Sequence, residues 1–177
     1  MNIILMGVQG SGKSTQGNLL SKELGIPYLS SGHIFREMAK EDTDWGRYVK
    51  KTMDAGHLIP DAEAVPIVME YLQKDEYKKG WIMDGFPRTP VQAEALNIPI
   101  QDVLYISVSD EETLKRLHER RENRSDDTDS AIQKRIEIFH TLTEPVLDYY
   151  RKKGLLREIN GEQSIEKVHE DIMKSLS

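Results

Sequence analysis

The residues with the clearest chemical character form a glycine-rich stretch, MGVQGSGKST, at positions 6–15. Gly7, Gly12, Lys13 and Ser14 match the pattern G-x-x-x-x-G-K-[ST], and the apolar residues 3–6 lead into them. Glycines let the backbone curl so that successive N–H groups point inward, and a helix beginning near Lys13 directs the positive end of its dipole to the same place. Because this concave surface suits a polyphosphate, we interpret the stretch as a phosphate-binding loop.

An acidic residue, Asp84, stands directly after the apolar residues 81–83, which are typical of a buried strand. Ligands of an open parallel sheet gather at the carboxyl ends of its strands, so Asp84 would share one edge with the glycine-rich loop. There Ser14 and, through water, Asp84 would hold a Mg²⁺ ion that accompanies the polyphosphate. An aspartate after a strand also begins many turns, and the loop upstream is what favours the metal site.

The overall composition limits the classes of protein to consider. A chain of 177 residues with 38% hydrophobic and 31% charged residues fits one globular domain. The sequence has no cysteine, which excludes disulfides, thiolate zinc sites and cysteine nucleophiles. Its net charge of −6 argues against nucleic-acid binding, and no stretch approaches the roughly 20 apolar residues of a membrane span. We expect a soluble cytoplasmic protein that contacts neither nucleic acid nor membrane.

The net charge is positive between Lys115 and Arg135, where the sequence has seven cationic residues and five acidic ones. Arg116 and Arg120 are four residues apart, so one helical face would present both. A run of this kind is usually a solvated helix surface whose arginines pair with neighbouring acids. Within an acidic chain, it also indicates a compact anionic ligand.

Short apolar runs alternate with longer helical patterns, which predicts βαβ units around a parallel sheet. The expected strands are residues 3–6, 28–30, 81–83, 103–108 and 156–159.

The helices between these strands have recognisable ends. Asp61 can cap one helix, Ser109 begins a possible capping box, and a last helix begins near Ser164. Thr128 or Asp129 opens a long helix that is bent or interrupted near Pro145.

Two segments fit this alternation poorly. Residues 31–60 hold two short helical pieces, more than a plain crossover requires, and residues 121–128, RENRSDDT, are polar throughout like an exposed flap.

Four motifs together resemble the adenylate kinases among the nucleoside monophosphate kinases. They are the glycine-rich loop, SSGHIFR at 30–36, AGHLIPD at 55–61 and DGFPRTPVQA at 84–93, and they occur in the family's order over nearly the whole chain. The resemblance implies a three-layer α/β P-loop NTPase fold with a central parallel five-stranded sheet flanked by helices. It also implies a single domain, 1–177, with a monophosphate-binding insert at 31–60 and a short lid at 121–128.

The activity that the resemblance implies is reversible phosphoryl transfer from Mg·ATP to AMP, giving two ADP, in a monomeric enzyme. The acceptor oxygen of a monophosphate is already anionic, so catalysis rests on alignment and on charge neutralisation rather than on a base. Arginine suits this task because its planar fork meets phosphate oxygens two at a time. By the family pattern, the catalytic residues are Lys13, Arg88, Arg120, Arg124 and Arg135.

The family pattern also divides the binding residues between two nucleotides. ATP would contact Gly10, Ser11, Gly12, Lys13, Ser14, Thr15, Arg116, Arg120 and Gln163. AMP would contact Ser31, Arg36, His57, Leu58, Ile59, Gly85, Arg88, Gln92, Arg124 and Arg135. In this pattern Arg116 stacks on the ATP adenine, and the Gln92 amide reads the adenine edge of AMP.

The chain departs from the family pattern in places. Many adenylate kinases have a long lid, sometimes pinned by four zinc-binding cysteines, whereas about eight cysteine-free residues take its place here, so no zinc is expected. His33 stands where the family usually has an aspartate, which predicts altered organisation of the metal; it can equally be an ordinary surface histidine.

Two other functions compete with this interpretation. UMP/CMP kinases share the loop and the short lid, but usually have asparagines after GFPR, where this chain has TPVQA. A P-loop switch or binding module would need a residue that positions water, and would have no use for Arg36, Arg88 and Gln92 as a second nucleotide pocket.

Overall fold

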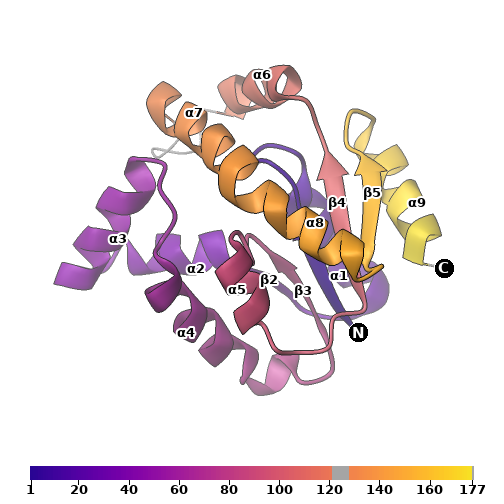
Figure 1. Ribbon diagram of the computed structural model, residues 1–177, viewed down its shortest axis with the longest axis horizontal. Coiled ribbons are helices and arrows are strands. Elements are labelled where there is room, and N and C mark those ends of the chain that lie inside the picture. Colours follow the sequence, from indigo (N-terminus) through magenta and orange to yellow (C-terminus); the bar gives the residue numbers. More distant parts are fainter. Residues whose placement is uncertain (121–127, 177) are drawn as a thin grey trace.

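The computed structural model describes residues 1–120 and 128–176, without the side chain of Arg120 (Figure 1). The segment interpreted as a short lid, 121–128, lies outside these ranges except for Thr128, and Arg124 lies outside them as well. Within the described ranges, no helix combines the length and the apolar character that crossing a membrane requires.

One parallel sheet of five strands, in the spatial order β2-β3-β1-β4-β5, forms the centre of the described chain. The strands are β1 (Asn2–Met6), β2 (Tyr28–Ser30), β3 (Trp81–Asp84), β4 (Asp102–Ser107) and β5 (Leu156–Asn160). All five lie within one residue of the expected ranges. The register sets Leu5 and Ser30 opposite Asp84, so the segments that follow β1, β2 and β3 leave the sheet at one edge.

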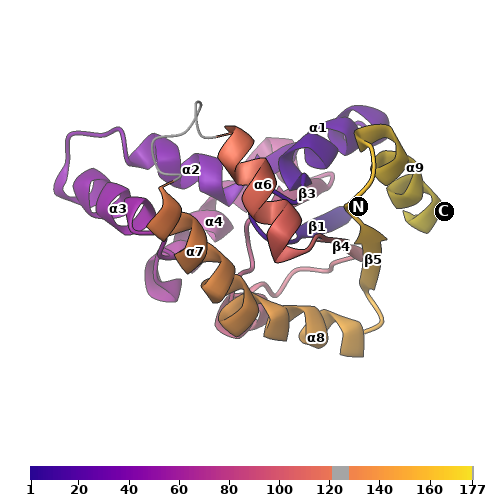
Figure 2. The ribbon, with the colours of Figure 1, turned by 90° about the horizontal axis from the view of Figure 1, so that it is seen from above.

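Helices cover both faces of the sheet and complete three layers (Figures 1 and 2). One face packs against α1 (Lys13–Leu24) and α9 (Ile165–Leu176). The other face packs against α4 (Asp61–Leu72), α5 (Pro90–Ala95) and α8 (Glu144–Lys152).

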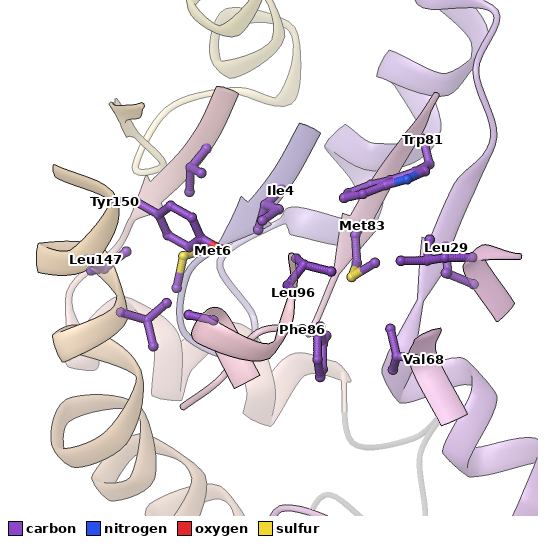
Figure 3. Close-up of a cluster of buried hydrophobic side chains, with 14 of the residues drawn as sticks. Ile4, Met6, Leu29, Val68, Trp81, Met83, Phe86, Leu96, Leu147 and Tyr150 are labelled. Carbon is purple, nitrogen blue, oxygen red and sulfur yellow. The ribbon is translucent and has the colours of Figure 1, made fainter. Parts of the chain in front are cut away.

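Alternate residues of the strands enter opposite cores. Ile3 and Leu5 pack with α1 and α9, whereas Ile4 and Met83 belong to the core on the other face, where Leu147 of α8 joins them (Figure 3). Because both of their faces are buried, the three inner strands, β1, β3 and β4, are mainly continuous apolar runs instead of alternating ones. The predicted three-layer α/β fold is confirmed.

The segment 31–60 contains two helices, α2 (Ser31–Met38) and α3 (Asp44–Asp54). Each begins with a hydroxyl cap, since the Ser30 side chain accepts a hydrogen bond from the N–H of His33 and the Thr43 side chain accepts one from Gly46. With the residues that follow, these helices build a small core of their own from Phe35, Val49, Ile59 and Ala64.

The expected start of α4 is wrong by one position. Asp61 is the first residue of the helix and Pro60 occupies the cap position, so the Asp61 side chain is turned to α5 and does not cap its own helix. Of the two residues expected to open the next helix, Thr128 is the cap and Asp129 the first helical residue. The Thr128 hydroxyl caps α7 (Asp129–Ile138) by accepting a hydrogen bond from Ala131 N–H at 3.2 Å.

The interruption expected near Pro145 is a π-helix, Phe139–Thr143, between α7 and α8. Proline has no N–H group to donate, so a regular α-helical bond is lost at this point. The wider turn places the Thr143 hydroxyl 2.9 Å from the carbonyl oxygen of Arg88, to which it donates.

His140 of this π-helix joins it to α6 (Asp110–Arg120). Its Nε2 lies 3.0 Å from both carboxylate oxygens of Asp110, and its Nδ1 lies 2.7 Å from Glu144 Oε1. The hydrogen bond with Glu144, and then Asp110, raise the pKa of His140. The two carboxylates therefore stabilise the imidazolium form of His140 relative to the neutral ring.

We expect His140→Gln to weaken the pH dependence of stability. A histidine whose pKa is raised on folding stabilises the protein fully below its unfolded value of about 6.5, and this contribution is lost as the pH rises through the folded value. Urea unfolding at about pH 5.5 and 8.5 should therefore show the variant losing less stability than the parent protein on going to high pH. His118→Gln, at an exposed position of α6, is the control. Equal behaviour of the two variants would contradict the prediction.

Candidate active site

The glycine-rich loop connects β1 to α1 at the edge where Asp84 ends β3. Gly7 has φ 150°, and a Cβ there would come within 2.6 Å of the carbonyl oxygen of Ile106. Gly12, the N-cap of α1, has φ 98°, so both positions require glycine. The first turn of α1 has no acidic residue to neutralise its positive end. These features form an anion-binding helix terminus.

Lys13 extends back over this loop. Its ammonium group donates to the carbonyl oxygens of Gly7 at 2.7 Å and Val8 at 2.8 Å, and lies 3.4 Å from Ser11 Oγ. The positive charge is therefore held where an anion bound by the loop would meet it.

Asp84 is 5% exposed and accepts two hydrogen bonds at Oδ2, from the Ser14 hydroxyl at 3.1 Å and from the Tyr28 hydroxyl at 2.8 Å. Burial, and then the charge of Asp84, raise the pKa of Tyr28, so the phenol stays protonated and can donate. The expected proximity of Ser14 and Asp84 is thus observed.

The sequence analysis missed Tyr28 and the residue that makes room for it. A Cβ at Gly17 would lie 2.3 Å from the Tyr28 ring, so only glycine at this position of α1 allows the ring to reach Asp84. A glycine inside a predicted helix is costly, and it was the signal that could have indicated this close approach.

A cavity of about 400 Å³ opens at this edge of the sheet. Its lining includes five cationic side chains, and Asp84 is the one acid among the described residues that line it. The cations come from separate elements and are Lys13, Arg36, Arg88, Arg116 and Arg135. The protein as a whole has a net charge of −6, whereas this cavity is strongly cationic. The cavity therefore suits a highly charged anion.

Arg88 lies in the loop after β3 and is half-buried. Its Nε donates to the carbonyl oxygen of Gly85 at 2.8 Å. Burial lowers the pKa of Arg88, the charges of Arg135 and Arg36 lower it further, and Asp84 opposes them. Three guanidinium groups are therefore brought close together against their mutual repulsion, which an anion between them would relieve.

Arg135 and Arg116 lie on the helices that flank the undescribed segment. Arg135 donates from Nη1 to Gln9 Oε1 at 3.1 Å and from Nη2 to the carbonyl oxygen of Met53 at 2.8 Å, so it joins α7 to the loop and to α3. Arg116 donates from Nε to Glu112 Oε1 at 2.7 Å and from Nη2 to the carbonyl oxygen of Gly161 at 2.9 Å.

A smaller cavity of about 50 Å³ adjoins the large one. The two share Gly32, Met53, His57, Leu58, Gly85 and Arg88. Most of its remaining lining is apolar, and Gln92 supplies a side-chain amide that is only 3% exposed. The other lining residues are Ser31, Phe35, Ile59, Ala64 and Phe86. An apolar slot with one amide beside a cationic cavity is a suitable place for an aromatic base attached to a phosphate.

Comparison with known proteins agrees with this geometry. The family model described as adenylate kinase matches residues 5–155, which contain the loop, the segment 31–60 and all five cations of the cavity. The chain belongs to the adenylate kinase family. It is therefore a phosphotransferase, a nucleoside monophosphate kinase that binds nucleotide substrates.

Curated adenylate kinases match the chain nearly from end to end. That of Leptospira biflexa serovar Patoc is 40% identical over 183 residues, which cover 98% of each chain. Those of Caldicellulosiruptor bescii and Bacillus subtilis are both 36% identical, over 212 and 208 residues. These two alignments cover 99% and 97% of this chain, and 99% and 96% of the relatives. They span more positions than the 177 residues of this chain, so those adenylate kinases contain segments that it lacks.

Of the residues that the adenylate kinase pattern singled out and whose side chains are described, all except Ser11 and Gln163 line one of the two cavities. Ser11 is only 2% exposed and lies beside Lys13. The Gln163 side-chain nitrogen donates hydrogen bonds to the Asn160 carbonyl oxygen and to Asp171. The Arg120 side chain and Arg124 lie outside the described residues. His33, where adenylate kinases usually have aspartate, has a side chain that is 68% exposed and faces Glu37.

Proposed function

We propose that the protein catalyses the reversible, Mg²⁺-dependent transfer of the terminal phosphoryl group of ATP to AMP, giving two ADP. The observation that supports this most strongly is the pairing of the two cavities. A cationic cavity over the glycine-rich loop adjoins an apolar slot with a buried amide, and Arg88 lines both. A P-loop switch that binds one nucleotide would have no use for this second slot.

In this mechanism the two nucleotides meet with their phosphates toward each other. A bond forms between a phosphate oxygen of AMP and the terminal phosphorus of ATP, while the bond from that phosphorus to the bridging oxygen breaks and leaves ADP. The attacking oxygen is already anionic, so no carboxylate base is needed. Lys13, the loop N–H groups and the arginines align the phosphates and stabilise their negative charge during transfer.

Each nucleotide has its own set of residues in this proposal. ATP binds to the loop residues Gly10 to Thr15, to Arg116 and Arg120, and to the segment at Gln163. AMP binds in the insert, where the small cavity takes its base and Arg36 and Arg88 take its phosphate, with Arg124 and Arg135 reaching the transferred group. The residues 121–128 act as a short lid that excludes water, since water in the site would compete as an acceptor.

The donor groups at the end of β3 fit a magnesium ion. Ser14 and Asp84 are oxygen donors in contact, which Mg²⁺ prefers, and Asp84 would act through water. Among the described residues, no group of three or more His, Asp or Glu side chains is placed to hold a metal ion. The ion is therefore expected to arrive with the ATP phosphates, whose charge it would neutralise, and to keep most of its water.

We also propose that a single chain is the active unit and that it works in the cytoplasm on free nucleotides. Both nucleotide sites are built from one chain, which supports a monomer. The net charge of −6 supports small anions over nucleic acid as partners, because the cationic groups are concentrated inside the cavity.

One assay tests this proposal. Purified protein with Mg·ATP is offered AMP, CMP, UMP or GMP in turn, with a sample lacking any acceptor as the control for ATP hydrolysis. We expect rapid diphosphate formation with AMP, slower formation with the other monophosphates, little hydrolysis without an acceptor, and loss of all transfer when EDTA removes Mg²⁺. A preference for CMP or UMP would indicate a UMP/CMP kinase instead. Absence of any diphosphate would overturn the proposal.

A further inference from the structure

The buried amide of Gln92 is held at both of its ends. Its oxygen, Oε1, accepts a hydrogen bond from the backbone N–H of Arg88 at 2.7 Å, and its nitrogen, Nε2, donates to Asp61 Oδ1 at 2.9 Å. Thr89, the N-cap of α5, donates from its hydroxyl to the same Asp61 oxygen at 2.9 Å. Asp61 therefore links the start of α4 to the helix that presents Gln92 to the small cavity.

These partners allow only one orientation of the amide. A backbone N–H can only donate and an ionised carboxylate can only accept. Turning the amide over would set its NH₂ group against the Arg88 N–H and its oxygen against the Asp61 carboxylate. Two buried polar groups would then be mispaired, which is costly away from water.

The fixed amide still has one hydrogen and one lone pair to offer. Its NH₂ group has two hydrogens, of which Asp61 takes one, and its oxygen accepts one bond from Arg88 while it has two lone pairs. A donor beside an acceptor matches a base edge with a ring nitrogen that accepts and an amino group that donates. Adenine and cytosine have this edge. Guanine and uracil have a ring N–H beside a carbonyl oxygen, so in the same pose they would set a carbonyl oxygen against the amide oxygen and a ring N–H against the amide nitrogen.

We infer that Asp61 is a specificity-determining residue, which selects the base of the monophosphate by fixing the direction of the Gln92 amide. This inference rests on the proposed function, in which the small cavity takes that base. Asp61 is not among the residues that line either cavity, so it acts on the base through Gln92 as a positioning residue. It favours bases with the amino edge and disfavours those with the carbonyl edge.

The test is Asp61→Asn, which keeps the shape of the side chain but can either donate or accept. Thr89 and Gln92 then no longer meet a group that only accepts, and only the Arg88 N–H still favours the observed orientation. Turning the amide would therefore mispair one buried group instead of two. We expect the ratio of kcat/KM for AMP to that for GMP, and likewise for UMP, to fall roughly tenfold, the scale on which one mispaired buried group acts. The change should lie mainly in the KM of the monophosphate, with the KM of ATP unchanged.

Asp44→Asn is the matched control, because Asp44 is likewise the first residue of a helix of this region but is fully exposed and paired with Arg47. Asp61→Glu keeps a group that only accepts and should preserve the discrimination. Asp61→Ser, which can also donate, replaces Asp61→Asn if that variant does not fold.

The outcomes separate this inference from the proposed function. If the unaltered protein makes no diphosphate, the proposed function fails. If it uses AMP well but Asp61→Asn lowers kcat/KM equally for all four monophosphates, or leaves the ratios unchanged, Asp61 has only a structural role and the inference is overturned. Equal use of all four monophosphates by the unaltered protein would overturn it as well.

Discussion

Replacing Arg88 by alanine is expected to lower kcat for ADP formation from ATP and AMP by about a thousandfold. Losses of this size are found when an enzyme loses a preorganised group that stabilises charge in the transition state. Arg88 lines both cavities and lies close to Arg36 and Arg135, so its guanidinium is placed where the transferred group passes. The KM of AMP should rise as well, while that of ATP changes little. Steady-state kinetics with each substrate varied in turn measure these effects.

The Arg88→Ala protein should remain folded. The backbone of Arg88 keeps its bonds to Gln92 and Thr143 when the side chain is removed, and the repulsion from Arg36 and Arg135 disappears with it. Arg47→Ala is the control, since Arg47 is an exposed arginine of α3 that pairs with Asp42 and Asp44. A folded Arg88→Ala protein with a turnover near that of the control would show that Arg88 does not stabilise the transferred group.

Replacing Lys13 by methionine is expected to lower kcat/KM for ATP by roughly a hundredfold or more. The ammonium group of Lys13 lies over the glycine-rich loop, and methionine keeps most of the length of the side chain without its charge. Affinity for AMP, measured by calorimetry without ATP, should be unchanged because the small cavity does not include Lys13. Arg88→Ala is expected to differ from this variant, because it should raise the KM of AMP and change that of ATP little.

Lys22→Met is the matched control for this change. Lys22 lies in the last turn of α1, the helix that begins at Lys13, and its side chain is exposed. Its loss should leave both kinetic constants near those of the unaltered protein. If Lys13→Met retained full activity with ATP, the loop would not be the donor site.

The sequence by itself determined the features that depend on local conformation. The loop from Gly7 to Ser14 could be recognised because its glycines have backbone angles that other residues rarely adopt, and because a helix begins directly after it. The five strands could be placed within one residue, and the three inner ones, β1, β3 and β4, stand out because burial on both faces requires apolar runs. The family motifs then indicated the function, although the roles of the individual site residues stay predictions.

Only the tertiary structure decided which side chains meet. Arg36, Arg88 and Arg135 come from α2, from the loop after β3 and from α7, and each alone looks like a surface cation in the sequence. Tyr28 reaches Asp84 across 56 positions of the chain, through space left by Gly17. Asp61, expected to cap its own helix, instead holds Gln92, which lies 31 positions away. Local patterns report the conformation of neighbouring residues, whereas these contacts depend on the order of strands in the sheet and on how the helices pack across it.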